Sequence, residues 1–272
     1  MTAAPTAIPQ IFDRQLVRRR RQRAALAIDD HDFLFREAAL RLLDRLDDIR
    51  RPFFRALDLG ARHGLLGSLG AGRGGIAWLV ACDPSSAMAR RHLAPSLVVD
   101  EETLPFAPAS FDLILSNLTL HAVNDLPGVL VQGRQTLRPG GLFLASLLGG
   151  KSLTELREVL LEAESELEGG ASPRVAPMAE LAELSGLLRR AGFVDPVVDS
   201  DRLTVRYAEP LRLLDDLRGM GESNALVARR RRFLRRTTLA RALALYRERY
   251  GDAEGRVPAT FEIFTLTGWV GG

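Results

Sequence analysis

A glycine-containing run, followed further along the chain by an acidic residue, is the part of this sequence best suited to hold a ligand. The run reads Asp-Leu-Gly-Ala-Arg-His-Gly over residues 58–64 and follows an apolar stretch. Gly60 lets the chain turn tightly beneath a ligand, and Gly64 lets a helix start close to the strand, because neither has a Cβ atom. Asp83 ends the next apolar stretch, where a carboxylate can accept hydrogen bonds from both hydroxyls of a ribose. The spacing predicts a nucleoside-containing ligand.

Arg62 stands where a dinucleotide-binding turn has its middle glycine. That glycine lets the backbone approach a pyrophosphate closely, so Arg62 argues against a dinucleotide. S-adenosylmethionine has no phosphate and tolerates the loss better. A left-handed backbone at this residue would cost about 1 to 2 kcal/mol, so we expect a slightly altered turn. We expect the Arg62 side chain to lie in solvent or, less favoured, to reach the methionine carboxylate of the cofactor.

Unbroken apolar runs place this turn at the end of a strand in an α/β protein. Such runs are typical of strands that are buried on both faces of a sheet. Helical spacing of apolar residues before the first run predicts two preceding helices, the second capped by Asp30 or Asp32. The expected strands are 53–59, 76–82, 111–116 and 141–148, and the expected helices are 12–26, 33–46 and 125–137, the last closed by Pro139-Gly140-Gly141.

The second half of the chain continues the alternation of helices and strands. We expect helices at 153–167, 178–191, 210–219 and 225–250, a strand at 194–207 interrupted at 199–202, and a last strand at 260–267. The pattern predicts a doubly wound, mostly parallel sheet whose late strands are free to run antiparallel. We assign 1–50 to a tail and helical cap, with a loose tail over 1–10, and 51–272 to the ligand-binding domain, with helical insertions at about 151–192 and 209–250.

The composition is that of a globular protein with clustered positive charge. The chain has 272 residues, 46% of them hydrophobic, and a net charge of +3. Its arginines cluster at 14–23 and at 229–236, and we interpret both clusters as solvated helix faces in preference to a surface for an acidic partner. No nucleic-acid-binding motif accompanies them. A single cysteine, Cys82, and the lack of a signal peptide or a membrane-spanning run predict a cytoplasmic protein without stable membrane insertion.

Longer stretches of the sequence resemble a known family. The runs ALDLGARHG, WLVACDPSSAM, VVDEETLPFAPASFD, LILSNLTLHAVNDLP and LRPGGLFLASLLGG resemble class I, seven-strand, Rossmann-like S-adenosylmethionine-dependent methyltransferases. The runs IFDRQLVRRRRQRAA, GGKSLTELREVLLEAESELEGGASPRVAPMAELAELSGLLRRAGF, TVRY, DLRGMGESNAL and ATFEIFTLTGW resemble the methyltransferase-fold assembly factors of respiratory complex I, in their bacterial form. The resemblance covers nearly the whole chain.

The resemblance implies where S-adenosylmethionine would bind. It assigns the methionine half of the cofactor to Asp58, Gly60 and Gly64, and the ribose to Asp83. The resemblance implies that Met88 packs near the adenine and that Asp100 meets the adenine edge. The alternatives are core packing for Met88 and loop capping for Asp100. The full implied set is Asp58, Gly60, Ala61 and Gly64 in the turn, Asp83, Pro84 and Met88 after the second strand, Asp100 and Glu101 at the adenine edge, and Ser116 and Asn117 nearest the sulfonium.

The residues after the fourth strand are the candidates to face a substrate. Asn117, His121 and Asp125 lie there, and His121 could accept a proton or orient a substrate, although capping or a bond to a backbone carbonyl is slightly favoured. Methyl transfer needs mainly positioning and exclusion of water, so no dedicated base is required. The four histidines show no iron-binding pattern, and no metal site is predicted. The linker GGASPRVAP, containing Arg174, is a candidate lid.

Three functions are compatible with the sequence, and the resemblance over residues 149–193 favours the first. The first is a cofactor-binding enzyme that modifies or helps to assemble a protein subunit of the respiratory chain, in a family whose members include arginine hydroxylases. The second is a carboxyl methyltransferase acting on an acyl thioester of an acidic carrier protein in biotin synthesis, with the cluster at 229–236 as docking surface. The third is an assembly chaperone that retains the cofactor without using it.

Overall fold

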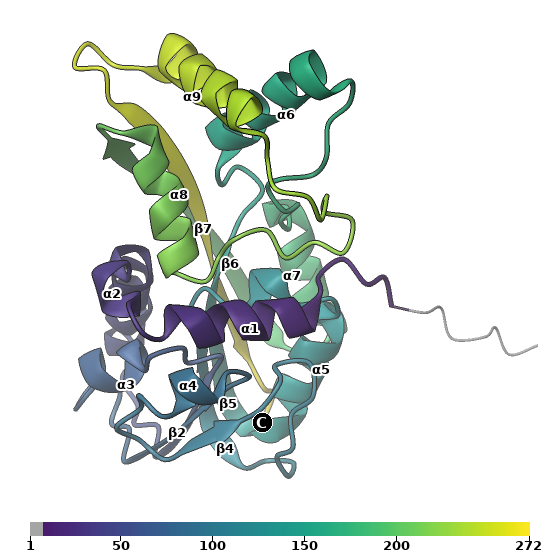
Figure 1. Cartoon of the computed structure of the whole chain (residues 1–272). Coiled ribbons are helices and arrows are strands. Elements are labelled where there is room, and N and C mark those ends of the chain that lie inside the picture. Colours follow the sequence, from purple (N-terminus) through teal and green to yellow (C-terminus); the bar gives the residue numbers. More distant parts are fainter. Residues whose placement is uncertain (1–7) are drawn as a thin grey trace, which may run out of the picture.

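The computed structural model describes residues 8–272 and contains one seven-stranded sheet in the order β3-β2-β1-β4-β5-β7-β6 (Figure 1). Its first five strands run parallel, and β7 runs antiparallel to both β5 and β6. This confirms the doubly wound, mostly parallel fold with late antiparallel strands. The strands are β1 (Arg55–Leu59), β2 (Trp78–Asp83), β3 (Ser96–Val98), β4 (Phe111–Ser116), β5 (Leu137–Leu148), β6 (Val194–Tyr207) and β7 (Val257–Trp269).

Helices cover both faces of the sheet. Neighbouring residues of β1 point to opposite faces, so that Ala56 packs in one core and Leu57 in the other. The first core takes α2, α6 and α9, and the second takes α5 and α7. The helices are α1 (Arg14–Ala24), α2 (Phe33–Asp47), α3 (Leu65–Leu69), α4 (Ser86–Ala89), α5 (Leu126–Thr136), α6 (Thr154–Glu168), α7 (Leu181–Arg190), α8 (Pro210–Gly219) and α9 (Arg236–Tyr250), with short 3₁₀ turns η1 (Ile28–Asp30) and η2 (Leu120–Ala122).

Three details of the expected elements are wrong. Helix α9 begins only at Arg236, because residues 225–227 instead form backbone hydrogen bonds and a β-bridge with the segment that precedes α1. Strand β6 runs through residues 199–202 without interruption, since every one of them pairs with β7. Ser200 and Arg202 lie on its exposed face, whereas Asp199 and Asp201 are half-buried and pair with arginines of α2. Pro139 and Gly140, expected to close a helix, lie within β5.

Helix α1 occupies the position that matters most for the site. It contacts α4 on one side and α8 on the other, and it crosses the middle of the molecule in front of the sheet (Figure 1). The proposed division of the chain at residue 50 stays a prediction; α2 packs in the same core as the sheet. The expected tail lies mostly outside the described residues. Within the described residues, no helix is long and apolar enough to cross a membrane.

The turn after β1 depends on a glycine at position 60. Gly60 has φ of +70°, and a Cβ atom there would lie 2.2 Å from Cγ2 of Thr119. Gly72 has a similar φ of +79°, but a Cβ atom there would meet nothing within 4 Å. A side chain would therefore carry a similar backbone cost at both positions, but only at Gly60 would it also clash with a neighbouring residue.

Replacing Gly60 by Ala is expected to lower the free energy of unfolding clearly more than replacing Gly72 by Ala. The Gly72→Ala change should cost about 1 kcal/mol, from its backbone conformation alone. The Gly60→Ala change should cost about 1 to 3 kcal/mol more, because Thr119 must shift. Urea unfolding of the two variants measures the difference, and equal losses would show that Thr119 moves freely.

Candidate active site

In the turn between β1 and α3, three residues have a left-handed backbone conformation. Gly60 and Gly64 have φ of +70° and +85°, and Arg62 between them has φ of +50°. The expectation of an altered turn that avoids this conformation is therefore wrong. The expected solvent position is also wrong, since Arg62 is 3% exposed.

The contacts of Arg62 offset the cost of its conformation. Its backbone N–H donates to Oδ2 of Asp83 at 3.1 Å, and its Nη2 donates to the carbonyl of Leu118 at 2.9 Å. The same Nη2 forms an ion pair with Glu222, and the guanidinium lies 4.3 Å from the ring centroid of Phe35. Arg62 thus joins the cofactor turn to the segment after α8.

Asp83, the predicted ribose ligand, is completely buried at the end of β2. Its Oδ1 accepts a hydrogen bond from the N–H of Ser85 at 2.8 Å. Its Oδ2 accepts from the N–H of Arg62 at 3.1 Å and from Nη1 of Arg21 at 3.2 Å. Both carboxylate oxygens are therefore engaged by the protein itself.

Glu101 lies beside Asp83 and is also completely buried. Its Oε1 accepts from Nη1 of Arg21 at 2.5 Å, and its Oε2 accepts from Arg14. Burial alone would raise the pKa of Glu101, but the guanidinium groups of Arg21 and Arg14 outweigh it and lower the pKa to about 2. Glu101 is therefore a carboxylate at neutral pH, held by two arginines of α1.

The interpretation of the first arginine cluster as a solvated helix face is wrong for two of its members. Arg21 is 1% exposed, and the side chain of Arg14 is 13% exposed. Arg18, Arg19 and Arg23 are exposed, as expected. The helix thus separates its arginines, because one face meets the buried carboxylates and the other meets water.

Asp58 is buried without compensation. It is 1% exposed, and neither carboxylate oxygen has a hydrogen-bond partner among residues 8–272. Burial, and secondarily the charge of Asp83, raises the pKa of Asp58 to about 8. Asp58 lines two cavities. One of about 10 Å³ is lined also by Phe35, Ala61 and Asn117, and one of about 260 Å³ is lined also by Gly64, Ala81 and His92, among others.

Other implied cofactor residues take part in internal contacts. Oγ of Ser116 donates to the carbonyl of Leu59, and Nδ2 of Asn117 donates to the carbonyl of Phe35. Oδ1 of Asn117 accepts from Ser146 at 3.0 Å. These side chains fix the end of β4 against β1, α2 and β5. Met88 packs in the hydrophobic core, Pro84 is buried beside Asp83, and Ala61 donates its N–H to the carbonyl of Cys82.

Two acidic candidates have local structural contacts. Oδ1 of Asp100 accepts from the N–H of Glu102 at 3.0 Å, which is the loop-capping alternative, and it also accepts from Arg14 at 2.6 Å. Asp125 caps α5 through the N–H of Gly128 at 2.8 Å. Among the described residues, the contacts of Asp125 therefore indicate a capping role and do not point its side chain toward a substrate.

His121 belongs to a group of contacting side chains, with Glu222 and Arg62, that the sequence did not reveal. Its Nε2 lies 3.2 Å from Oε2 of Glu222, while Oε1 of Glu222 pairs with Arg62. The expected cap or backbone contact of His121 is therefore wrong. Burial would raise the pKa of Glu222, but Arg62 and His121 lower it well below its usual range. Nothing in the spacing of residues 62, 121 and 222 could have indicated this contact.

An apolar cavity of about 270 Å³ opens beside His121 and Glu222. His121 and Glu222 contribute to its wall, and most of the remaining wall is aliphatic. Arg174 of the candidate lid lies in the wall and pairs with the buried Glu164 at 2.8 Å. The apolar wall residues are Phe12, Val17, Leu153, Leu156, Leu160, Val175, Met178, Leu214, Leu217, Leu234 and Leu239.

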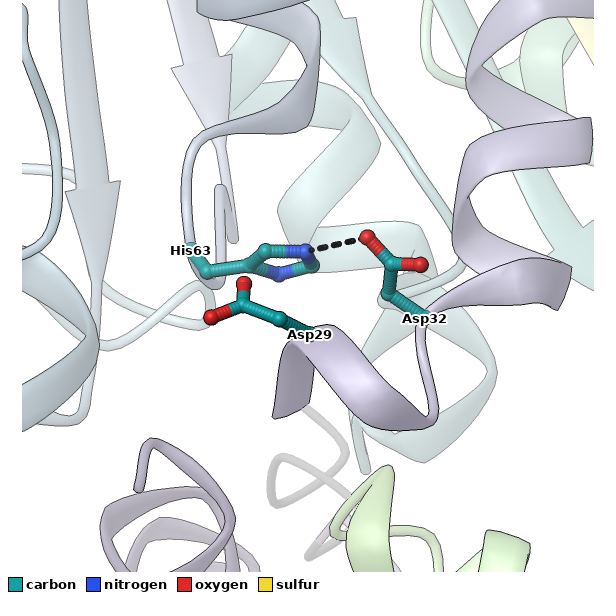
Figure 2. Close-up of side chains that lie close together, drawn as sticks. All are labelled: Asp29, Asp32 and His63. Atoms are coloured by element: carbon teal, nitrogen blue, oxygen red, sulfur yellow. Dashed lines mark hydrogen bonds and ion pairs between the residues drawn. The ribbon is translucent and has the colours of Figure 1, made fainter. Parts of the chain in front are cut away.

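Figure 2 shows a third cluster, formed by Asp29, Asp32 and His63. One potential ligand atom from each lies within 4.8 Å of the others. His63 Nε2 lies 3.2 Å from Oδ2 of Asp32, which also accepts from Arg36, and Asp29 pairs with Arg91. Each carboxylate is thus already neutralised by an arginine. The structure brings together only one histidine here, and the prediction of no metal site stays a prediction.

Comparison with known proteins identifies the family. Residues 57–145 match the model of a methyltransferase domain. The chain is 40% identical over 95% of its length to the arginine-hydroxylase NDUFAF5, mitochondrial, of Danio rerio, of which it covers 82%. The chain belongs to the NDUFAF5 family. This confirms the family predicted from the sequence.

More distant matches agree with this family and its fold. The chain is 36% identical over 96% of its length to the malonyl-[acyl-carrier protein] O-methyltransferase of Halorhodospira halophila, of which it covers 89%. Phosphoethanolamine N-methyltransferase 2 of Haemonchus contortus, solved with S-adenosylhomocysteine, has a TM-score of 0.60 at 16% identity, over 94% of this chain and 60% of that chain. These matches confirm the fold of an S-adenosylmethionine-dependent methyltransferase in this NDUFAF5-family protein.

The residues of the turn fit the methionine end of that cofactor. The unpartnered carboxyl of Asp58 is suited to an ammonium group, because a buried polar group without a partner is costly and an amine would satisfy it. Gly60 leaves no room for a side chain between the turn and Thr119. The ribose end is different, since Arg21 already engages Asp83. The individual cofactor contacts stay predictions.

The raised pKa of Asp58 predicts that binding of S-adenosylhomocysteine strengthens as the pH rises. With a pKa of about 8, the free protein holds this carboxyl mostly protonated at neutral pH, whereas an ammonium group favours the carboxylate. The proton must therefore leave on binding, and affinity should rise by up to about tenfold per pH unit between about pH 6 and 8. Calorimetry across this range measures the slope. Asp58→Asn should bind more weakly and lose most of the slope, and the same slope in both proteins would assign the proton to another group.

Proposed function

We propose that this NDUFAF5-family protein binds S-adenosylmethionine in the turn after β1 and modifies an arginine side chain of a protein substrate that enters the cavity beside His121 and Glu222. The observation that carries the proposal is the charge of the cavity wall. Glu222 is held as a carboxylate by Arg62 and His121, and the rest of the wall is largely aliphatic.

An arginine side chain matches both properties of this cavity. Its three methylene groups favour apolar surface, and its guanidinium favours a carboxylate. Glu222 retains 17% exposure of its side chain, so one edge remains open to an incoming group. The relatives at 40% identity are named as arginine hydroxylases, which supports the same substrate class.

The residues around the cavity can position a substrate and hold a proton. When bound, S-adenosylmethionine supplies an activated methyl group. Asp58 would hold its ammonium group and Asp83 its ribose. Nδ1 of His121 is buried and has no hydrogen-bond partner among the described residues, while its Nε2 faces Glu222. In the tautomer that donates from Nε2, Nδ1 is free to accept a proton from a substrate.

The second function, methyl transfer to an acyl group on a carrier protein, is supported by the relative from Halorhodospira halophila. A substrate of that kind bears a carboxylate. The Glu222 carboxylate in the wall disfavours a second carboxylate, and both arginines of the wall are already paired, Arg174 with Glu164 and Arg218 with Asp215. The cavity therefore supports a cationic side chain over an anionic acyl group.

Deletion of the gene in its own organism, followed by mass spectrometry of the respiratory-chain subunits, tests the proposal. Loss of a modification on one arginine supports it, and the added mass, one oxygen or one CH₂ group, identifies the chemistry. A growth requirement for biotin with unchanged arginines would establish the carrier-protein function instead. Failed complex I assembly with unchanged arginines and normal biotin synthesis would leave the chaperone function.

Replacing Glu222 by Gln is expected to reduce the modified fraction of that arginine at least tenfold. The change keeps the size of the side chain but removes the charge that pairs with a guanidinium, and a hydrogen bond to a charged group contributes about 1.5 to 3 kcal/mol. Complementation of the deletion strain measures the effect. Asp215→Asn is the matched control, since Asp215 forms an exposed ion pair with Arg218 near the same cavity. A folded Glu222→Gln protein that restores full modification would contradict this role.

A further inference from the structure

Helix α1 places its polar side chains onto the predicted cofactor carboxylates. Arg14 pairs with Asp100 and Glu101, and Arg21 pairs with Asp83 and Glu101. The next residue, Gln22, accepts hydrogen bonds from Oγ of Ser85 at 2.9 Å and from the N–H of Ala87 at 3.1 Å. The helix is thus fastened to the β2–α4 corner along its second half.

Arg21 uses the acceptor capacity that a ribose would need. Oδ2 of Asp83 already accepts from the N–H of Arg62, and Oδ1 accepts from the N–H of Ser85. The bond from Arg21, at 3.2 Å, is the longest of the three and the only one from a side chain. A backbone donor cannot leave without unfolding the turn, whereas the Arg21 side chain, which is 1% exposed, can be withdrawn together with its helix. Arg21 is therefore the partner that a ribose would replace.

Arg21 does not use all of its hydrogen-bond donors in its buried position. Its Nε and Nη2 are buried without hydrogen-bond partners among the described residues. A buried donor without an acceptor is costly, so these two groups oppose the observed position of α1 while the carboxylates hold it.

The same helix contributes to the substrate cavity. Val17 of α1, and Phe12 just before it, are buried residues of the cavity wall. Phe12 forms a β-bridge with Leu226, and Arg20 donates to the carbonyl of Ser223, next to Glu222. A displacement of α1 therefore changes the wall of the cavity as well as the cofactor carboxylates.

We propose that Arg21 is an internal occupant of the ribose position, so that α1 must release Asp83 before the cofactor binds, and that this release reshapes the substrate cavity. Arg21 then sets the affinity for the cofactor, and α1 couples the two sites. The inference rests on the cofactor assigned under the proposed function, and its tests use S-adenosylhomocysteine with the whole chain.

Calorimetry of Arg21→Met is the first test. Methionine keeps the length and apolar stem of the side chain and removes the competing charge. Since apparent affinity is the intrinsic affinity multiplied by the fraction of open protein, the variant should bind S-adenosylhomocysteine at least tenfold more tightly than the wild type. Arg18→Met, an exposed position on the same helix, is the control and should bind as the wild type does. A folded Arg21→Met protein that binds equally or more weakly would overturn the proposal.

A reversible cross-link tests the proposal without removing Arg21, in case Arg21→Met leaves two buried carboxylates that prevent folding. Oε1 of Gln22 lies 3.4 Å from Oγ of Ser86, so cysteines at both positions can be joined by a short bis-methanethiosulfonate cross-linker that spans α1 and α4 and that reduction removes. The natural Cys82 is completely buried and its pKa is raised by burial, so it does not compete. The cross-linked protein should lose binding of S-adenosylhomocysteine and regain it on reduction. Equal binding in both states would overturn the proposal, whereas no binding by the wild type would contradict the cofactor assignment itself.

Discussion

Two completely buried carboxylates, Asp83 and Glu101, face one guanidinium group, that of Arg21. Two like charges in a region of low dielectric repel each other strongly, and each also loses its hydration. Arg21 between them offsets part of this cost, because it lowers the pKa of Glu101 and opposes the rise that burial causes in the pKa of Asp83. The rest of the site follows from this constraint, because Arg21 brings α1 across the sheet, and α1 brings with it the segment that pairs with residues 225–227.

A second buried cation, Arg62, organises the other half of the site. It holds a left-handed conformation in the turn between β1 and α3, packs on Phe35 and forms an ion pair with Glu222. Through these contacts the β1 turn, α2 and the loop after α8 share one polar network. The cofactor turn and the cavity wall are therefore parts of the same electrostatic arrangement, although they lie far apart in the sequence.

The fold could be predicted from the sequence because its signals are local. An unbroken apolar run such as residues 111–116 forms the same buried strand in the structure, β4, and the turn residues Gly60 and Gly64 both have the left-handed backbone that glycine permits. The site could be predicted only in part. Asp58 and Asp83 lie near the turn between β1 and α3 because each stands at the carboxyl end of its strand. The order of the strands in the sheet is enough to predict this.

What the sequence did not provide is the pairing of charges through space. Arginines in a run look alike, and whether one is buried depends on acidic residues that the fold brings opposite it. Arg21 meets Asp83 and Glu101 only once the sheet exists, and Glu222 meets Arg62 only once α8 has packed. For the same reason the exposed and buried arginines of α1 could not be told apart. Residues 225–227 lie in a stretch predicted to be helical but pair instead with the segment that precedes α1.

The bridge between Phe12 and Leu226 has a consequence for how the protein is made. Synthesis proceeds from the N-terminus, so α1 leaves the ribosome before Asp83 and Glu101 exist and long before Leu226 does. An isolated helix of 11 residues is marginal in water, and until its partners are made its arginines stay hydrated. Helix α1 is synthesised before the sheet but is therefore among the last elements to pack. The nascent chain exposes this basic helix until most of the protein has been translated.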